Sequence, residues 1–166
     1  MFGRLTGLAG VLVLLAACSN TPPAPTTSGP GGPGGPGGPG GMSTSQYAPG
    51  SQQDLAATAG DRVFFAYDRA NISPEGQQIL ERQAQWLQHF PNVSVTIEGH
   101  CDERGTREYN LALGERRAEA AKHVLVALGV PEGRIRTISY GKERPIVVGS
   151  NEEAYAQNRV GITTVN

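Results

Sequence analysis

The distribution of hydrophobic and polar residues divides the chain into three parts. Residues 7–17 form an apolar run, and the segment that follows has almost nothing to bury. From about residue 52 onward, apolar positions recur at the periods of strands and helices. Because each amphipathic element must bury its apolar face against another, the hydrophobic core is expected within residues 52–166.

Four short runs in this last part are expected to form β-strands. Residues 93–99 alternate strictly between apolar and polar side chains, as in a strand with one buried face. The three other runs are rich in β-branched and aromatic residues and span residues 62–67, 134–141 and 160–165.

Two long stretches with helical periodicity lie between these strands. The first follows Ser73-Pro74-Glu75, which supplies an N-cap, a proline at the first helical position and an early acid. The second spans about Glu108 to Leu128, with an apolar stripe of Leu111, Gly114, Ala118, Ala121, Leu125 and Leu128. A short helix is expected over residues 152–159. The order β-α-β-α-β-(α)-β predicts an α/β fold, a two-layer sandwich with helices on one face of a mixed sheet.

The apolar run near the N-terminus is typical of a secretory signal, because it is too short to span a bilayer comfortably. It ends in Leu-Ala-Ala-Cys, which resembles the bacterial lipobox. This resemblance implies that residues 1–17 are a lipoprotein signal peptide and that Cys18 is lipidated. With Ser19 next, it also implies an anchor in the outer membrane, facing the periplasm. The alternative is an ordinary signal peptide followed by an incidental cysteine.

Residues 18–51 are expected to form a lipidated N-terminus and a disordered tether rich in proline and glycine. Residues 30–41 contain four Pro-Gly-Gly units, but the run is too short for collagen and has glycine where collagen prefers an imino acid. A coil of this length has a root-mean-square span of roughly 30–40 Å. Such a tether would let the domain that follows reach away from the membrane.

Charge and cysteine content exclude several functional classes. The formal net charge of −1 offers no global attraction for nucleic acid. The two cysteines are Cys18 and Cys101, and if the first carries lipid the second has no partner in the chain. A disulfide-stabilised scaffold is therefore excluded.

Residues 99–118, GHCDERGTREYNLALGERRA, concentrate the polar chemistry of the chain. A Cys-His catalytic pair is disfavoured, because neighbouring side chains of a strand point to opposite faces. Cys101 is expected on the core face as a small buried residue, and His100 on the face of Thr96 and Glu98. A metal site is disfavoured as well, since the acids alternate with arginines that would repel a cation.

Two interpretations of this segment remain. Asn110, Leu113 and Arg117 share one helical stripe, and the preceding loop carries Asp102, so an acid and an arginine could together bind a zwitterion. The alternative is a solvated helix start with ordinary surface ion pairs. The residues alone leave both interpretations open.

The same segment, with YDRANISPEG before it and SYGKERPIVVGSNEEAYAQNR after it, resembles the OmpA C-terminal-domain family over residues 62–166. The resemblance implies a non-enzymatic domain that binds the peptide stem of peptidoglycan and needs no cofactor. In that stem, diaminopimelate carries an ammonium and a carboxylate on one side-chain end. Asp102 would bind the ammonium and Arg117 the carboxylate, both from the surface of a groove. The other groove residues implied are Tyr67, Asp68, Arg104, Thr106 and Leu113.

The resemblance also implies a second partner, TolB, and a role in drawing the outer membrane inward at cell division. One departure is Val160, which follows Asn158-Arg159 where many relatives have a second arginine, so no binding role is assigned to it. A tethered cell-wall hydrolase is the rival hypothesis. It would need a carboxyl group with a raised pKa, whereas the acids here stand among arginines, which lower carboxyl pKa values.

Overall fold

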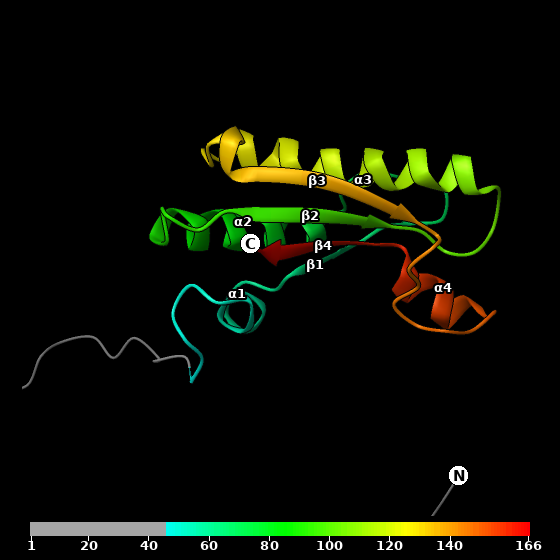
Figure 1. Cartoon of the computed structure of the whole chain (residues 1–166), viewed down its shortest axis with the longest axis horizontal. Coiled ribbons are helices and arrows are strands. Elements are labelled where there is room, and N and C mark those ends of the chain that lie inside the picture. Colours follow the sequence, from blue (N-terminus) through cyan, green and yellow to red (C-terminus); the bar gives the residue numbers. More distant parts are fainter. Residues whose placement is uncertain (1–45) are drawn as a thin grey trace, which may run out of the picture. The chain divides into compact units, whose positions relative to one another are not determined.

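The structure, a computed structural model, describes residues 46–166 (Figure 1). The predicted signal peptide, the lipidation site at Cys18 and most of the predicted tether lie outside these residues. Within the described part, no helix is both long and apolar enough to cross a bilayer.

A four-stranded mixed sheet forms one layer of the domain. The strands are β1 (Arg62–Phe64), β2 (Val95–His100), β3 (Ile135–Gly141) and β4 (Val160–Val165). Their spatial order is β1-β4-β2-β3, with β2 parallel to β3 and β4 antiparallel to both of its neighbours. The predicted mixed sheet is confirmed, although β1 ends three residues earlier than expected.

Helices form the second layer. The elements are α1 (Gln52–Thr58), α2 (Pro74–His89), α3 (Arg107–Ala127), a 3-10 turn (Glu132–Arg134) and α4 (Glu152–Asn158). The two long helices α2 and α3 run along the same side of the sheet, and α4 lies past the sheet end where β3 finishes (Figure 1). The predicted α/β sandwich is confirmed.

Local sequence signals account for the starts of both long helices. The Ser73 hydroxyl accepts a hydrogen bond from the Gly76 amide at 3.1 Å, and Pro74 follows as the first residue of α2. The Thr106 hydroxyl accepts one from the Tyr109 amide at 3.2 Å at the start of α3. Each cap satisfies an amide that the helix itself leaves unpaired.

Helix α1 was not expected from the sequence. It is only seven residues long, and an isolated helix of that length is unstable in water. Tertiary contacts hold it in place: Leu55 is fully buried, and Asp54 accepts a hydrogen bond from the Trp86 indole of α2 at 3.1 Å.

The inward face of α3 differs from the predicted stripe. Leu111 is 51% exposed, whereas Asn110 and Arg117 are buried. The apolar prediction holds for the C-terminal part of the helix, where Ala118, Ala121 and Leu125 join the core. The first half of this buried face therefore mixes the polar Asn110 and Arg117 with the apolar Leu113.

A glycine pair sets how closely α3 approaches the sheet. A Cβ atom built on Gly99 of β2 would lie 1.9 Å from the carbonyl oxygen of Gly114 in α3. Both positions therefore require glycine for this packing. The close approach brings the first half of α3 against the end of β2.

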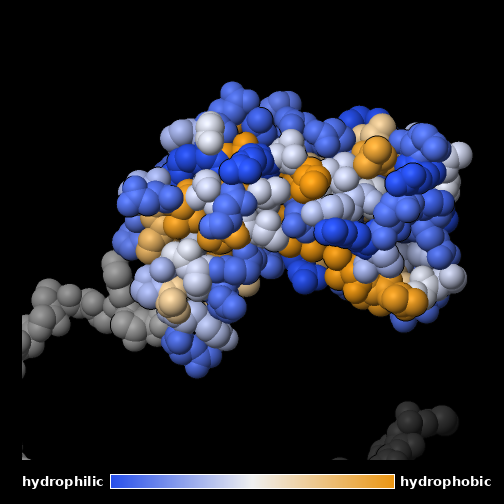
Figure 2. Space-filling view, in the orientation of Figure 1, coloured by the Kyte–Doolittle hydropathy of each residue, from blue (hydrophilic) through white to orange (hydrophobic). Residues whose placement is uncertain are grey.

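The sheet face that α2 and α3 leave uncovered carries isolated apolar residues. Phe64 and Ile138 are partly exposed on it, in register with the outward side chains of β4 and β2. The surface in this view is mainly hydrophilic, with hydrophobic residues gathered along its lower edge toward α4 (Figure 2).

Candidate ligand-binding site

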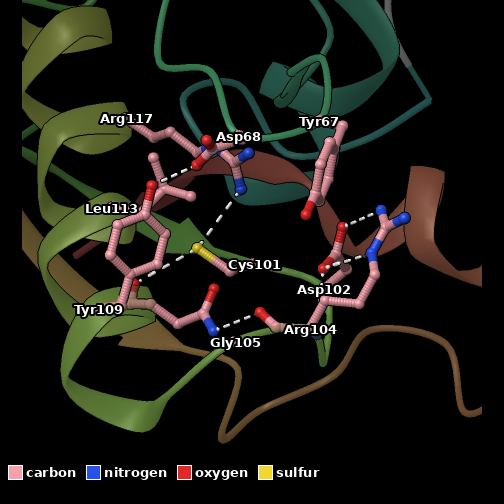
Figure 3. A pocket seen from close by; sticks show the side chains of 10 residues that line it. Tyr67, Asp68, Cys101, Asp102, Arg104, Gly105, Tyr109, Leu113 and Arg117 are labelled. Atoms are coloured by element: carbon pink, nitrogen blue, oxygen red, sulfur yellow. Dashed lines mark hydrogen bonds and ion pairs between the residues drawn. The ribbon is translucent and has the colours of Figure 1, made fainter.

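A pocket opens where β2 ends and the loop to α3 begins (Figure 3). Six of the seven residues predicted for the groove line it: Tyr67, Asp68, Asp102, Arg104, Leu113 and Arg117. The remaining lining residues are Cys101, Gly105, Tyr109 and Asn110. Thr106 is the exception, because its side chain is exposed and caps α3.

Arg117 projects from the inward face of α3 and is 1% exposed, so the prediction that it lies at the groove surface is wrong. Its guanidinium donates hydrogen bonds to three backbone carbonyls, those of Ala66, Arg69 and His100, at 3.2, 2.8 and 2.7 Å. The sequence could not indicate this burial, because the acceptors lie 17 to 51 residues away along the chain. Arg117 therefore also holds the loop after β1 against the end of β2.

The positive charge of Arg117 is not neutralised by a direct ion pair. Within residues 46–166, no carboxylate lies within 4.0 Å of its guanidinium. Burial accordingly lowers the pKa of Arg117 from its ordinary value, and a guanidinium still keeps its proton. A buried cation whose hydrogen bonds go to neutral carbonyls creates a favourable position for an anion in the adjoining pocket.

Asp102 lies just past the end of β2 and is 4% exposed, so it too is buried rather than at the groove surface. It accepts hydrogen bonds from Arg104 through Nη2 at 2.6 Å and Nε at 3.2 Å, and one from Arg159 at 3.4 Å. Burial by itself would raise the pKa of Asp102, but the hydrogen bonds from Arg104 and Arg159 outweigh it and lower the pKa below its ordinary value. Asp102 is therefore ionised.

Arg104 lies close to two aromatic rings. Its guanidinium carbon lies 4.0 Å from the ring centre of Tyr67 and 4.5 Å from that of Tyr155. The ring of Tyr67 and the pairing with Asp102, both seen in Figure 3, together with the ring of Tyr155, orient the guanidinium.

Arg159 was not predicted as part of the site. It is buried at the end of α4, where it donates to the Phe65 carbonyl at 3.1 Å and pairs with Glu152 at 2.8 Å as well as with Asp102. The only sequence feature that could have indicated a role for Arg159 is its place in the family pattern at residues 158–160. Its contact with Asp102 depends on folding, since 57 residues separate the two.

The opposite wall of the pocket carries a second acid. Asp68 has a positive φ of 55°, a conformation that aspartate tolerates better than most residues. The Tyr109 hydroxyl donates a hydrogen bond to its carboxylate. Tyr109 was missed at the sequence level, because the first turn of α3 reads as a solvated helix start.

Cys101 lies beneath the pocket as the small buried residue expected from strand alternation. Burial raises the pKa of its thiol to about 11, so the thiol stays protonated at neutral pH and is a poor nucleophile. His100 points to the other face, where its Nε2 lies 3.5 Å from Glu98. The expected separation of cysteine and histidine is confirmed.

The loop between Asp102 and α3 is held in place by side chains that donate hydrogen bonds to its backbone carbonyls. Lys142 donates to the carbonyls of Glu103 and Gly105 at 3.1 and 2.6 Å, and the Asn110 amide donates to that of Arg104 at 2.8 Å. In the part of the chain described here, no three His, Cys, Asp or Glu residues are grouped so that they could hold a metal ion. The pocket is thus lined by the buried Arg117, by Arg104 and by two acids, Asp68 and Asp102, and the buried Arg159 contacts Asp102.

This fold and this pocket define a class of protein. Residues 64–159 match the model of the OmpA family, and the chain therefore belongs to that family. The crystal structure of the C-terminal domain of Helicobacter pylori MotB shares the fold with a TM-score of 0.60 at 23% identity, covering 64% of this chain and 84% of that one.

Within the family, the chain is similar to peptidoglycan-associated lipoproteins. It is 48% identical to the one from Agrobacterium fabrum over 151 residues, which cover 91% of this chain and 81% of the relative. It is 55% identical to the one from Brucella melitensis over 118 residues, 71% and 70% of the two chains. The crystal structure of the one from Burkholderia pseudomallei has a TM-score of 0.63 at 40% identity and covers 64% of this chain and 90% of that one.

Proposed function

We propose that this protein is an outer-membrane lipoprotein whose folded domain binds the peptide stem of peptidoglycan non-covalently, through the pocket at the end of β2. The observation that carries the proposal is Arg117, a buried arginine without an acid partner among the described residues, in a pocket that also holds the ionised Asp102. A ligand with one carboxylate and one ammonium matches these two charges. The relatives' names, which associate them with peptidoglycan, support this choice of ligand.

Diaminopimelate in the stem is the proposed contact. Its side-chain end carries an ammonium and a carboxylate on the same carbon, so both charges can enter one small pocket. The carboxylate would face Arg117 and the ammonium Asp102. Tyr67, Asp68 and Leu113 would contact the remainder of the stem from the pocket walls.

The proposal includes two wider roles. Through a lipid on Cys18 the protein would link the outer membrane to the cell wall, with the domain in the periplasm. It would also bind TolB and support constriction of the envelope at division. Membership of the OmpA family and similarity to peptidoglycan-associated lipoproteins support these roles.

A hydrolase mechanism fits this pocket poorly. A general acid needs a raised pKa, yet the pKa of Asp102 is lowered. The pKa of the neighbouring Glu103 is lowered as well, chiefly because the Tyr155 hydroxyl donates a hydrogen bond to it. Both carboxylates are therefore suited to binding a cation rather than to donating a proton.

The direct test changes the ligand and leaves the protein intact. Stem peptides with free or amidated diaminopimelate would be titrated into the domain by isothermal calorimetry. Amidation removes the negative charge, and one charge-assisted hydrogen bond contributes about 1.5–3 kcal/mol, so we expect affinity to fall about ten- to a hundredfold. Equal affinity for both peptides would contradict the proposed contact with Arg117.

A variant pair tests the same contact from the protein side. Arg117→Ala should weaken binding by at least about ten- to a hundredfold, but it should also destabilise the fold by about 3 kcal/mol or more, because three carbonyls lose their donor. Circular dichroism must therefore confirm that the titrated sample is folded. Arg116→Ala is the control, because Arg116 directly precedes Arg117 in α3 and is exposed. This variant should bind the peptide as the wild type does. An equal loss in both variants would count against Arg117 as the anion contact.

A further inference from the structure

The carboxylate proposed to receive the ligand's ammonium is already occupied in the free protein. Arg104 donates two side-chain hydrogen bonds to Asp102, and its own backbone amide donates a third at 3.2 Å. An incoming ammonium therefore meets a guanidinium at the position it needs. The site can be filled only if Arg104 gives up part of this pairing.

The surroundings of Arg104 allow that exchange. Its backbone is held by Asn110, but its side chain is 34% exposed and is held only by Asp102, the two tyrosine rings and a 3.5 Å contact with Glu152. Glu152 is itself largely exposed, so that contact adds little. If Asp102 is released, the guanidinium can keep its contacts with the two rings and turn its edge toward the pocket.

Asp102 does not become unpaired in the exchange. Arg159 remains beside it, buried and fixed by the Phe65 carbonyl and Glu152. Two of the three arginines near the pocket, Arg117 and Arg159, are thus anchored by backbone carbonyls. Arg104 has no backbone acceptor among the described residues, so it is the one that can change partner.

The exchange affects two kinds of ligand differently. A ligand with an ammonium alone replaces one ion pair by another and leaves the Arg104 guanidinium with only its 3.5 Å contact with the exposed Glu152. A ligand with both charges supplies a new carboxylate for the guanidinium that its ammonium displaces. Selectivity of this kind comes from a penalty on the wrong ligand as well as from attraction to the right one.

We propose that Arg104 is the specificity-determining residue of the site: it pairs with Asp102 in the free protein and passes to the ligand's carboxylate when the ligand's ammonium takes its place. The pocket thereby rejects side chains that end in an ammonium alone, such as lysine, and accepts those that end in an ammonium and a carboxylate. This inference rests on the proposed function and names the selectivity of the same site.

The test compares two stem peptides that differ only in whether diaminopimelate or lysine stands at the third position. Each is titrated by calorimetry into the wild type, Arg104→Gln and Arg107→Gln. Arg107 is the matched control, since it lies three residues away with its side chain 73% exposed and pairs with Glu143 at 3.6 Å. Glutamine keeps a donor for Asp102 but removes the charge and the planar fork.

The wild type and Arg107→Gln should prefer the diaminopimelate peptide by about tenfold or more, the scale of one charge-assisted pair. In Arg104→Gln the lysine peptide should bind more tightly and the diaminopimelate peptide more weakly, so the preference should shrink about tenfold or more. Arg104→Lys keeps a positive charge but lacks the planar fork of the guanidinium. Its preference for the diaminopimelate peptide should therefore lie between those of the wild type and Arg104→Gln. Circular dichroism verifies folding of each variant.

Three outcomes would overturn the inference. If Arg104→Gln keeps the wild-type preference, Arg104 does not set selectivity, while the proposed function stands. If Arg104→Gln loses affinity for both peptides equally, Arg104 is a general contact or a structural residue. If the wild type binds neither peptide, the proposed function itself fails, and this inference fails with it.

Discussion

Asp102 and Arg117 carry opposite charges in one pocket, and the protein stabilises each by different means. Asp102 is paired with two guanidinium groups, whereas Arg117 is bonded to backbone carbonyls. An ion pair lowers the cost of burying the acid, and neutral acceptors satisfy the donors of the arginine without cancelling its charge. At the residue scale, the site is therefore charged and ordered before any ligand arrives.

The lowered pKa of Asp102 predicts a pH-dependent contribution to stability. A carboxyl group whose pKa is lower in the folded state stabilises the fold above its unfolded pKa, about 3.9, and loses this effect as pH falls through the folded value. Asp102→Asn should therefore lower the free energy of unfolding by about 1.5–3 kcal/mol at pH 7 and by clearly less near pH 2–3.

Urea unfolding of both proteins at these pH values measures the difference. Glu108→Gln provides a control for removing an exposed acid from the same segment. A destabilisation by Asp102→Asn that is the same at every pH would show that the charge of Asp102 is not what stabilises the fold.

At the scale of elements, the pocket depends on where α3 meets β2. The contact between Gly99 and Gly114 lets the helix lie close enough for Arg117 to reach the His100 carbonyl at 2.7 Å. Lys142, which directly follows β3, holds the loop between the two elements by donating to the carbonyls of Glu103 and Gly105. The geometry of the site is thus set by helix–sheet packing and not by the loop alone.

Gly99→Ala should therefore damage both stability and binding. Its added methyl group would lie 1.9 Å from a backbone carbonyl oxygen, which no rotamer change can relieve, so we expect a loss of about 3 kcal/mol or more. Thermal unfolding by circular dichroism measures this loss. Gly133→Ala is the control, because an added Cβ there meets nothing within 4 Å. Equal unfolding temperatures for the two variants would disprove the role of the close contact.

At the scale of the whole molecule, function depends on combining a membrane anchor with the folded domain. The position of the anchor at Cys18 is predicted from the Leu-Ala-Ala-Cys signal, because Cys18 lies outside the described residues. Two or more acyl chains give stable attachment where a single chain does not. The domain would then sample the cell wall from a fixed membrane surface.

Cys18→Ser should remove that attachment without altering the domain. We expect the protein to leave the outer-membrane fraction, while the purified domain binds isolated sacculi as before, because residue 18 is far in sequence from the pocket residues. Membrane fractionation and intact-mass analysis of the mature N-terminus test this. Continued outer-membrane fractionation of Cys18→Ser, with no acyl mass on the wild type, would refute lipidation.

The sequence by itself determined the elements whose signals are local. Strict alternation placed β2, and side-chain caps with an early proline placed α2, because these signals act between residues that are neighbours along the chain. Six of the seven predicted groove residues line the pocket, since they follow strand ends or share one face of α3. Their roles in binding remain predictions.

Only the tertiary structure decided how those residues are used. The formation of α1, the burial of Arg117, the participation of Arg159 and the contacts of Arg104 with the rings of Tyr67 and Tyr155 each depend on how separate segments pack. Helical periodicity put Leu111 in the core, yet α3 turns Asn110 and Arg117 inward, where loop carbonyls accept their hydrogen bonds. The physical reason is that the free energy of burying a polar side chain depends on its partners, and those partners are brought together only by the fold.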